Sequence, residues 1–335
     1  MKKLKVLCLT HETLIPPANL PAGGSFHNEP WRTEQYVVST LRRMGHEARL
    51  IGVRNELSVI RQAIDEFHPE IVFNLLEEFH DQVLYDQNVV SYLELVPIPY
   101  TGCNPRGMIL SRDKALARKV LSYHRIPGPD FIVFRRGRKV RRPRCLGFPL
   151  IVKSQIEEAS LGISQASIVE DDQALIERVT FMHERCRTDV IVEEYIEGRE
   201  LYVGVLGDER LSVLPIWELS FSNMPDGQAR IATRKVKWDP RYQAKHGIVS
   251  GPAKDITPDI QQRITTLCKR TYRALGLSGY ARLDLRLKET GEPFIIEANP
   301  NPEIAYGEDF AAAAEHAGIS YEELLQRIVS IGVHR

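Results

Sequence analysis

The chain has few cysteines, and none of them is spaced like the ligands of a metal site or the partners of a disulfide framework. They are Cys8, Cys103, Cys145, Cys186 and Cys268. Zinc sites use closely paired cysteines, and small secreted domains carry even sets that staple short loops. The scattered pattern argues against both kinds of protein and favours a reducing, cytoplasmic location.

The chain also lacks an excess of charge of either sign and lacks long apolar runs. Lys plus Arg and Asp plus Glu each number 44, so net charge gives no reason to expect a nucleic-acid or membrane partner. No stretch approaches the 18 apolar residues of a membrane span. The apolar start at residues 4–9 is interrupted by Lys5 and lacks a cleavage site, so we interpret it as a buried strand.

A basic cluster at 135–142 reads as a solvated loop, with a polyanion site as the alternative.

Neither of the common glycine-rich phosphate loops, Gly-x4-Gly-Lys and Gly-x-Gly-x-x-Gly, occurs. Two weaker phosphate signals are present. Residues 148–152 form a continuous apolar run that predicts a buried strand and delivers Lys153 at its end, where it can act as a point charge for a phosphate or reach solvent. The small residues within 158–164 would let backbone N–H groups approach phosphate oxygens, although most such segments are only turns.

Strands alternate with helices in the first hundred residues. Strands are predicted at 4–10, 48–53 and 71–75, and helices at 34–44 and 59–67. This order predicts a parallel sheet covered by helices, in a unit that ends near residues 99–102. A loop rich in Pro and Gly follows the first strand, at the sheet edge where open α/β proteins bind ligands.

The remainder mixes helices and strands with less regular order. Helices are predicted at 111–123, 171–187, 257–275 and 320–331, and strands at 131–134, 149–153, 190–195 and 200–206. Ser111 is the expected N-cap of the first of these helices. Residues 222–252 carry many Pro, Gly and charged residues without periodicity, which predicts a long ordered loop over a site.

A predicted hairpin near the C-terminus brings two acids together. Residues 280–287 alternate polar and apolar, so Arg282 and Asp284 share one face. A two-residue turn at 290–291 would place Asp284 opposite Glu297 and Arg282 opposite Asn299. Facing carboxylates favour a hard cation such as Mg²⁺ between them. The alternative is a salt bridge from one acid to Arg282 or Arg286, and a β-bulge would shift the register and break the pairing.

Together these pieces resemble the ATP-grasp superfamily and, within it, the D-alanine–D-alanine ligases. The resemblance spans about residues 71–330 and rests on the order and spacing of its motifs. They are 71–76, 99–102, 113–114, 149–153, 192–200, 282–284, 297–299 and 317–321. It implies an α/β protein of ATP-grasp fold, with an N-terminal parallel α/β domain at 1–103. Central and C-terminal α+β domains, at 104–192 and 193–335, would clasp ATP.

The resemblance also implies a nucleotide site. Its residues would be Lys114, Lys153, Ser160, Gly162, Glu193, Glu194, Tyr195, Ile196, Glu200 and Lys237. Lys114, near the start of a helix, and Lys153, at the end of a strand, would contact the phosphates. The backbone of the strand 193–196 would bind the edge of the adenine. Glu200 would bind the ribose hydroxyls. Glu193 and Glu194 could instead be two solvated acids, and Lys237 one exposed lysine of a basic stretch.

The implied catalytic and metal residues lie on the loops and on the hairpin. The resemblance implies that Ser160 would belong to the loop that closes over the γ-phosphate and Lys237 to a longer lid, and that Arg282 would stabilise the oxyanion of the tetrahedral intermediate. The ligands of two Mg²⁺ ions, with Mn²⁺ as a substitute, would be Asp284, Glu297 and Asn299. The implied reaction activates a carboxylate as an acyl phosphate and joins it to an amine.

Three departures from the D-alanine ligases all concern the substrate pocket. Residues 23–27 match the Gly-Gly-x-Ser-x-Glu segment poorly, Glu77-Glu78 replaces His-Gly, and Glu303 replaces the Gly of a Pro-Gly turn. We therefore expect an ATP-dependent ligase of amino acids or small carboxylates. A genuine D-alanine–D-alanine ligase and a nucleotide-binding regulatory protein without turnover are the alternatives. If the chain forms an assembly, we expect a homodimer.

Overall fold

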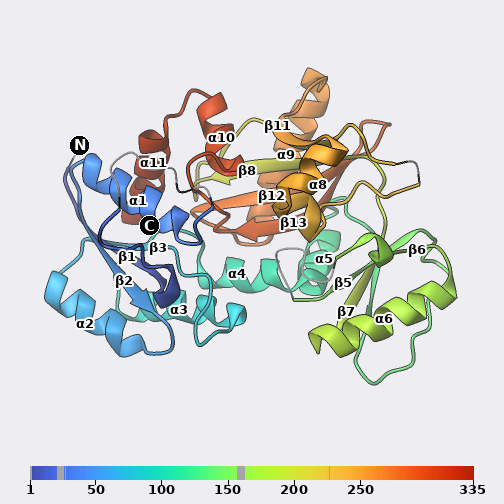
Figure 1. Cartoon of the computed structure of the whole chain (residues 1–335), viewed down its shortest axis with the longest axis horizontal. Coiled ribbons are helices and arrows are strands. Elements are labelled where there is room, and N and C mark those ends of the chain that lie inside the picture. The colour runs from blue at the N-terminus through green and yellow to red at the C-terminus, as the bar shows by residue number, and fades with distance from the viewer. Residues whose placement is uncertain (1, 21–25, 27, 157–162, 226) are drawn as a thin grey trace.

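The N-terminal unit contains a parallel sheet, as the sequence predicts. The computed structural model describes residues 2–20, 26, 28–156, 163–225 and 227–335. Strands β1 (Lys5–His11), β2 (Glu47–Val53) and β3 (Ile71–Asn74) lie in the order β2-β1-β3. Helices α1 (Arg32–Arg43), α2 (Leu57–Phe67) and α3 (Asp86–Leu95) surround this sheet, at the left of Figure 1. The C-terminal helix α11 (Tyr321–Val333) packs beside β3 and α1, so both chain ends meet in this unit.

A four-stranded antiparallel sheet lies at the opposite end of the molecule (Figure 1). Its order is β4 (Phe131–Phe134), β7 (Val190–Glu194), β5 (Leu150–Ser154) and β6 (Ile168–Val169). Helix α6 (Asp172–Cys186) covers it and begins at Asp171, whose carboxylate accepts the N–H of Ala174. Val152, Val179 and Met182 are fully buried between helix and sheet.

A six-stranded antiparallel sheet lies between the other two (Figure 1). Its strands are β8 (Arg199–Leu206), β9 (Ser212–Val213), β10 (Trp217–Phe221), β11 (Ile248–Pro252), β12 (Tyr280–Leu287) and β13 (Pro293–Pro300). Helices α9 (Pro258–Ala274) and α10 (Asp309–His316) pack on it, and short 3-10 helices occur at Glu12–Leu14, Val83–Tyr85 and Gln165–Ser167. Its outer strand β13 carries Glu297 and Asn299, two of the predicted metal ligands. The division of the chain at residues 103 and 192 stays a prediction.

The predicted helix 111–123 is wrong at its start. The structure has two helices, α4 (Pro105–Arg112) and α5 (Lys114–Tyr123), separated by Asp113 in an extended conformation. Asp113 caps α5 by accepting the N–H of Leu116, whereas the Ser111 hydroxyl donates to the carbonyl of Gly107 inside α4. The break places Lys114 at the first position of α5.

The predicted loop 222–252 also contains regular structure. It holds α7 (Arg234–Trp238), α8 (Pro240–His246) and β11. Both helices are too short to show apolar periodicity, and each depends on its N-cap, Thr233 or Asp239. The basic cluster 135–142 forms an irregular, mostly exposed segment. Within the described ranges, no helix has the length and apolar character that a membrane crossing requires.

Candidate active site

The hairpin of β12 and β13 brings the predicted pairs face to face. Asp284 lies opposite Glu297 and Arg282 opposite Asn299, which confirms the predicted register. The route to this register differs from the prediction. Leu287 pairs with Pro293, and the N–H of Lys288 donates to the carbonyl of Glu292, so the turn is one residue longer than expected.

A β-bulge beyond Asp284 compensates for the longer turn. The register shifts between Asp284 and Leu285, which pair with Glu297 and Ile295, so Ile296 is the added residue. The sequence argument held that a bulge would separate the acids, but here the bulge restores their pairing.

Arg118 on α5 holds the bulge in place. Its guanidinium donates to the carbonyl oxygens of Ile295, at 2.5 Å, and of Ile296, and its Nε donates to Glu193 at 2.6 Å. One buried side chain thereby joins α5 to both sheets that border the site. Sequence reasoning missed Arg118, although it lies four residues after Lys114 and hence on the same helix face.

Glu193 lies at the centre of a buried charge cluster. Its carboxylate accepts from Arg118 and, at 2.8 Å, from the ammonium of Lys153 at the end of β5. Burial alone would raise the pKa of Glu193, but the two cations lower it to about 2. The side chain is 1% exposed, so Glu193 is not a solvated acid. Its charge fixes the position of Lys153 at the edge of the cleft.

The hairpin acids are each paired with a different cation. Lys114 Nζ lies 2.9 Å from Glu297, and Arg282 holds Asp284 with two hydrogen bonds of 2.7 and 3.0 Å. The predicted alternative, a salt bridge from one acid to Arg282 or Arg286, is therefore confirmed for Asp284, which pairs with Arg282, and wrong for Glu297. Arg286 pairs instead with Glu200 at 2.7 Å.

The two acids differ electrostatically although they face each other. Burial raises the pKa of Asp284, and the adjacent Arg282 offsets this only in part. Burial acts in the same direction on Glu297, but three lysines, Lys114 foremost, lower its pKa overall. The site is therefore internally neutralised, with cations placed where phosphates would need them.

Most of the predicted nucleotide residues line one cleft, which encloses about 660 Å³ including the part open to solvent. They are Lys153, Glu193, Glu194, Tyr195, Ile196, Glu200 and Lys237, and two of the predicted metal ligands, Asp284 and Glu297, line the same cleft. Lys114 and Arg282 reach it through their acidic partners. Ser160 and Gly162 lie outside the described residues. A cleft of this size suits a small cofactor-like ligand.

The donors at the hairpin fit a hard divalent cation. Asp284, Glu297 and Asn299 offer two carboxylates and an amide on one face of β12 and β13, and oxygen ligands are those that Mg²⁺ prefers. The buried amide nitrogen of Asn299 has no hydrogen-bond partner within the described ranges. The side chain is thus not committed to holding the fold.

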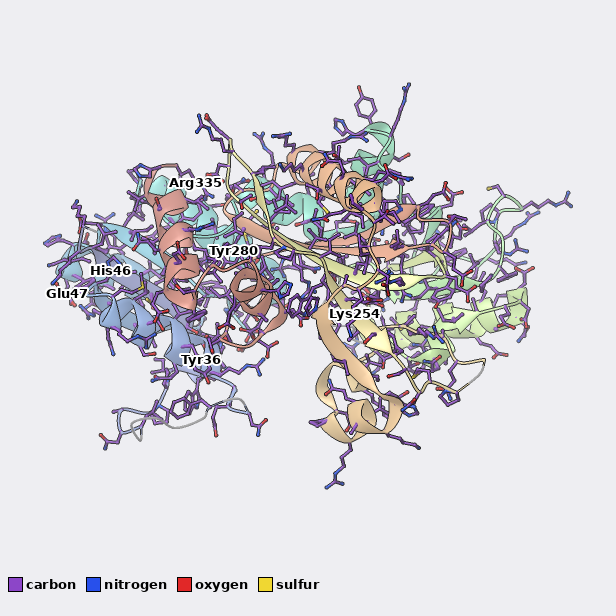
Figure 2. All side chains as sticks on the ribbon, turned by 90° about the horizontal axis from the view of Figure 1, so that it is seen from above. Tyr36, His46, Glu47, Lys254, Tyr280 and Arg335 are labelled. Atoms are coloured by element: carbon purple, nitrogen blue, oxygen red, sulfur yellow. The ribbon has the colours of Figure 1, made fainter. Side chains whose placement is uncertain are left out.

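A second pocket, of about 530 Å³ including open space, lies at the other end of the same strand pair. Tyr280, at the start of β12, lies near the middle of the molecule and lines it (Figure 2). Glu77 and Glu303, two of the departures from the D-alanine ligases, line it as well. Glu77 and Glu303 are far apart in the sequence, and the fold brings both into the same pocket beside the hairpin.

A third acid in this pocket was not singled out from the sequence. Glu34 on α1 is 3% exposed; one oxygen accepts from Thr10 Oγ1 at 2.7 Å, and the other has no hydrogen-bond partner among the residues that the structure describes. Burial raises the pKa of Glu34, and Glu303 adds to this. The signal was available, because Glu34 shares the apolar helix face of Val37, Val38 and Leu41.

Comparison with known proteins agrees with this geometry. Residues 120–330 match the family described as D-ala D-ala ligase C-terminus. An uncharacterized protein of Sinorhizobium fredii is 31% identical over 92% of this chain and 90% of its own, and a D-alanine–D-alanine ligase of Desulforudis audaxviator is 30% identical over 91% and 94%.

Solved structures extend the likeness to the whole fold. The D-alanine–D-alanine ligase of Bacillus anthracis complexed with ATP covers 98% of both chains with a TM-score of 0.74 and 22% identity. That of Coxiella burnetii gives a TM-score of 0.72 at 16% identity, over 99% of this chain and 96% of its own. The chain is an ATP-dependent ligase that uses a divalent metal and forms carbon–nitrogen bonds, and it belongs to the D-alanine–D-alanine ligase family of the ATP-grasp superfamily.

Proposed function

We propose that this ligase activates a small carboxylic acid with more positive charge than D-alanine, such as a diamino acid, and couples it to an amine. The observation that carries this proposal is the arrangement of two pockets on one strand pair. Asp284 in the nucleotide cleft and Tyr280 in the acidic pocket lie four residues apart on the same face of β12, a spacing of about 13 Å. Arg282 lies between them, where the two reactants would meet.

The chemistry follows from this order. A carboxylate oxygen of the substrate attacks the γ-phosphorus of ATP, and the bond to ADP breaks. Lys114 and Lys153 would neutralise the phosphates during transfer, which needs charge compensation more than covalent help. A bound divalent metal, proposed as two Mg²⁺ or Mn²⁺ ions on Asp284, Glu297 and Asn299, supplies further positive charge to the phosphates.

The second half-reaction forms the amide. The amine attacks the acyl carbon, charge develops on the former carbonyl oxygen, and phosphate leaves with the oxygen that came from the substrate carboxylate. Arg282 would stabilise that developing charge. Ser160, Gly162 and Lys237 belong to the segments proposed to close over the site, because an acyl phosphate must be kept from water.

The acidic pocket supports a cationic substrate. Burying the second carboxylate oxygen of Glu34, which makes no hydrogen bond to the described residues, is costly, so a ligand that brings an ammonium group regains that free energy. Glu303 is partly offset by Arg32, which lies 3.6 Å away but only 2.7 Å from Glu308. Three acids, Glu34, Glu77 and Glu303, line this pocket, and its acidic character is the feature on which the proposal depends.

A steady-state screen of ADP release with D- and L-amino acids, singly and in pairs, tests the proposal. We expect basic or diamino acids to give higher kcat/KM than D-alanine. Glu34→Gln should raise KM for the preferred acid by about tenfold, with KM for ATP unchanged, whereas Glu47→Gln on the exposed start of β2 should change neither. Highest efficiency with D-alanine pairs would establish a genuine D-alanine–D-alanine ligase instead, and no turnover with any acid would favour a regulatory nucleotide-binding protein.

The wider setting stays proposed as well. The balance of 44 basic and 44 acidic residues supports small-molecule substrates without a nucleic-acid partner. Five scattered free cysteines support a cytoplasmic enzyme. Light scattering of the purified protein would test the proposed homodimer.

A further inference from the structure

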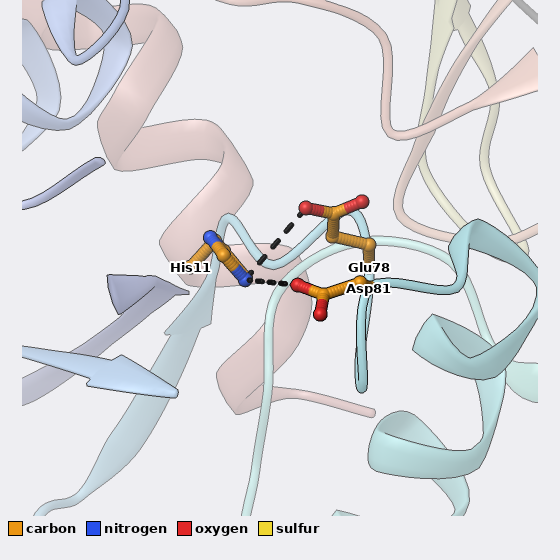
Figure 3. Close-up of side chains that lie close together, drawn as sticks. All are labelled: His11, Glu78 and Asp81. Atoms are coloured by element: carbon orange, nitrogen blue, oxygen red, sulfur yellow. Dashed lines mark ion pairs between the residues drawn. The ribbon is translucent and has the colours of Figure 1, made fainter. Parts of the chain in front are cut away.

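Three potential metal ligands converge outside both pockets, at the carboxyl end of β1 (Figure 3). His11 is the last residue of β1, and Glu78 and Asp81 come from the loop that follows β3. His11 Nε2 lies 3.7 Å from an oxygen of Glu78 and 3.7 Å from an oxygen of Asp81. All three ligand atoms lie within 4.8 Å of one another.

The imidazole of His11 is buried, and the nitrogen that faces Glu78 and Asp81 makes no hydrogen bond to the described residues. His11 is 5% exposed, and Nε2 has no hydrogen-bond partner within the described ranges. The other nitrogen, Nδ1, lies 2.8 Å from Thr13 Oγ1 and 3.4 Å from the Thr13 backbone nitrogen. The Thr13 backbone N–H donates to Nδ1, so the ring proton lies on Nε2; a metal at Nε2 would require the other tautomer, in which Nδ1–H donates to Thr13 Oγ1. In that second tautomer the lone pair of Nε2 faces two carboxylates, and a bound metal cation would take the place that a ring proton holds in the first.

The surrounding contacts resemble an outer ligand shell. Arg54 holds Asp81 with hydrogen bonds of 3.1 and 3.0 Å and also reaches Glu12 at 3.1 Å. Each carboxylate oxygen has two lone pairs, so the Asp81 oxygen near His11 can accept from Arg54 and still bind a metal. Metal-bound imidazoles and carboxylates in proteins commonly have such hydrogen-bond partners, which fix their orientation.

We propose that His11, Glu78 and Asp81 form a second metal site, for a first-row divalent transition cation such as Zn²⁺. The mixed nitrogen and oxygen donors suit Zn²⁺ rather than Mg²⁺, which distinguishes this site from the all-oxygen hairpin. Tetrahedral ligands at zinc bond lengths are about 3.4 Å apart, so the observed 3.7 Å closes with a small side-chain movement. The cation would tie the loop that carries Glu77, a wall of the acidic pocket, to the end of β1.

Zinc titration of the nucleotide-free protein tests this site. Calorimetry would use the full chain with millimolar Mg²⁺ present, so that Mg²⁺ competes with Zn²⁺ for the oxygen-only site, and a thermal melt would follow with and without Zn²⁺. We expect one Zn²⁺ per chain and a higher melting temperature when it is bound. His11→Asn and Glu78→Gln should each weaken Zn²⁺ binding by about tenfold or more.

His80→Asn is the matched control. His80 is exposed, adjoins Asp81 and has a left-handed backbone, φ 58°, which Asn tolerates. This variant should bind Zn²⁺ like the unmodified protein. Melting curves without metal would show whether His11→Asn folds, and Glu78→Gln, on a partly exposed side chain, carries the test if it does not. Absence of Zn²⁺ binding in the submillimolar range, or unchanged binding in Glu78→Gln, would overturn the proposal and leave the ligase chemistry untouched.

Discussion

Glu297→Gln is the most informative single change in the catalytic cleft. Glu297 faces Asp284, which repels it, and pairs with Lys114 at 2.9 Å. Since the lysines lower its pKa overall, the charged form is favoured in the folded state, and attraction outweighs repulsion. Removing the charge should therefore destabilise the ligand-free protein, contrary to what like-charge repulsion between the hairpin acids alone would give.

The size of the loss can be worked from the contact. Gln still accepts a hydrogen bond from Lys114, so only the ionic part is lost, about 1–2 kcal/mol, which lowers the melting temperature by about 1–3 °C. The effect on catalysis should be far larger. If Glu297 holds the metal as proposed, its loss should cost several kcal/mol of transition-state stabilisation, about 10²–10⁴ in kcat.

Thermal melts with and without Mg²⁺-ATP, run beside an ADP-release assay, measure both effects. The stabilisation that Mg²⁺-ATP gives the unmodified protein, about 2.7 kcal/mol at a hundredfold excess over Kd, should shrink in Glu297→Gln. Glu289→Gln, on the exposed turn of the same hairpin, should behave like the unmodified protein. A Glu297→Gln enzyme with normal kcat would refute the metal assignment, and one that melts higher without ligand would refute the charge balance.

Four further substitutions separate the roles of the buried charges and of the segments proposed to close over the site. Lys153→Ala should nearly abolish turnover and weaken ATP binding, with a smaller effect for Lys114→Ala; unchanged kinetics in both would remove their phosphate role. Glu193→Gln should cost about 3–5 kcal/mol at pH 7 in urea titrations. Because the folded pKa of Glu193 is lowered from 4.5 to about 2, this difference is fully present above about pH 4.5 and is lost as pH falls towards 2. Gln165 follows the loop of Ser160 and Gly162, and its side chain makes two hydrogen bonds, of 2.9 and 3.0 Å, to Ala229 in the loop that carries Lys237. If the two loops close over ATP together, Gln165→Ala should raise KM for ATP without changing the melting temperature.

The elements that can be predicted from the sequence are those whose hydrophobic periodicity is contained within a single segment of the chain. The alternating strands of the N-terminal unit and the polar face of β12 follow from periodicity alone, and both agree with the structure. The break at Asp113 does not, because a single capping side chain decides between one helix and two. Short helices such as α7 and α8 depend in the same way on one residue each.

The site shows the same division. The pairing of Asp284 with Glu297 was predictable only because a longer turn and a bulge cancel, and the bulge depends on Arg118, which reaches it from α5. No spacing rule connects residues that far apart in the chain. Glu34 likewise reads as one polar residue on an apolar helix face until the fold places it beside Glu303. Contacts between distant segments are what a single sequence leaves undetermined.

The central claim is that a carboxylate is activated as an acyl phosphate and then captured by an amine. The direct test supplies the best acid from the substrate screen with ¹⁸O in its carboxylate, together with Mg²⁺-ATP and the amine, and measures the phosphate by mass spectrometry. The account predicts that each turnover transfers one ¹⁸O from the acid to inorganic phosphate, with ADP as the other product. Unlabelled phosphate, or label in AMP with release of pyrophosphate, would contradict it.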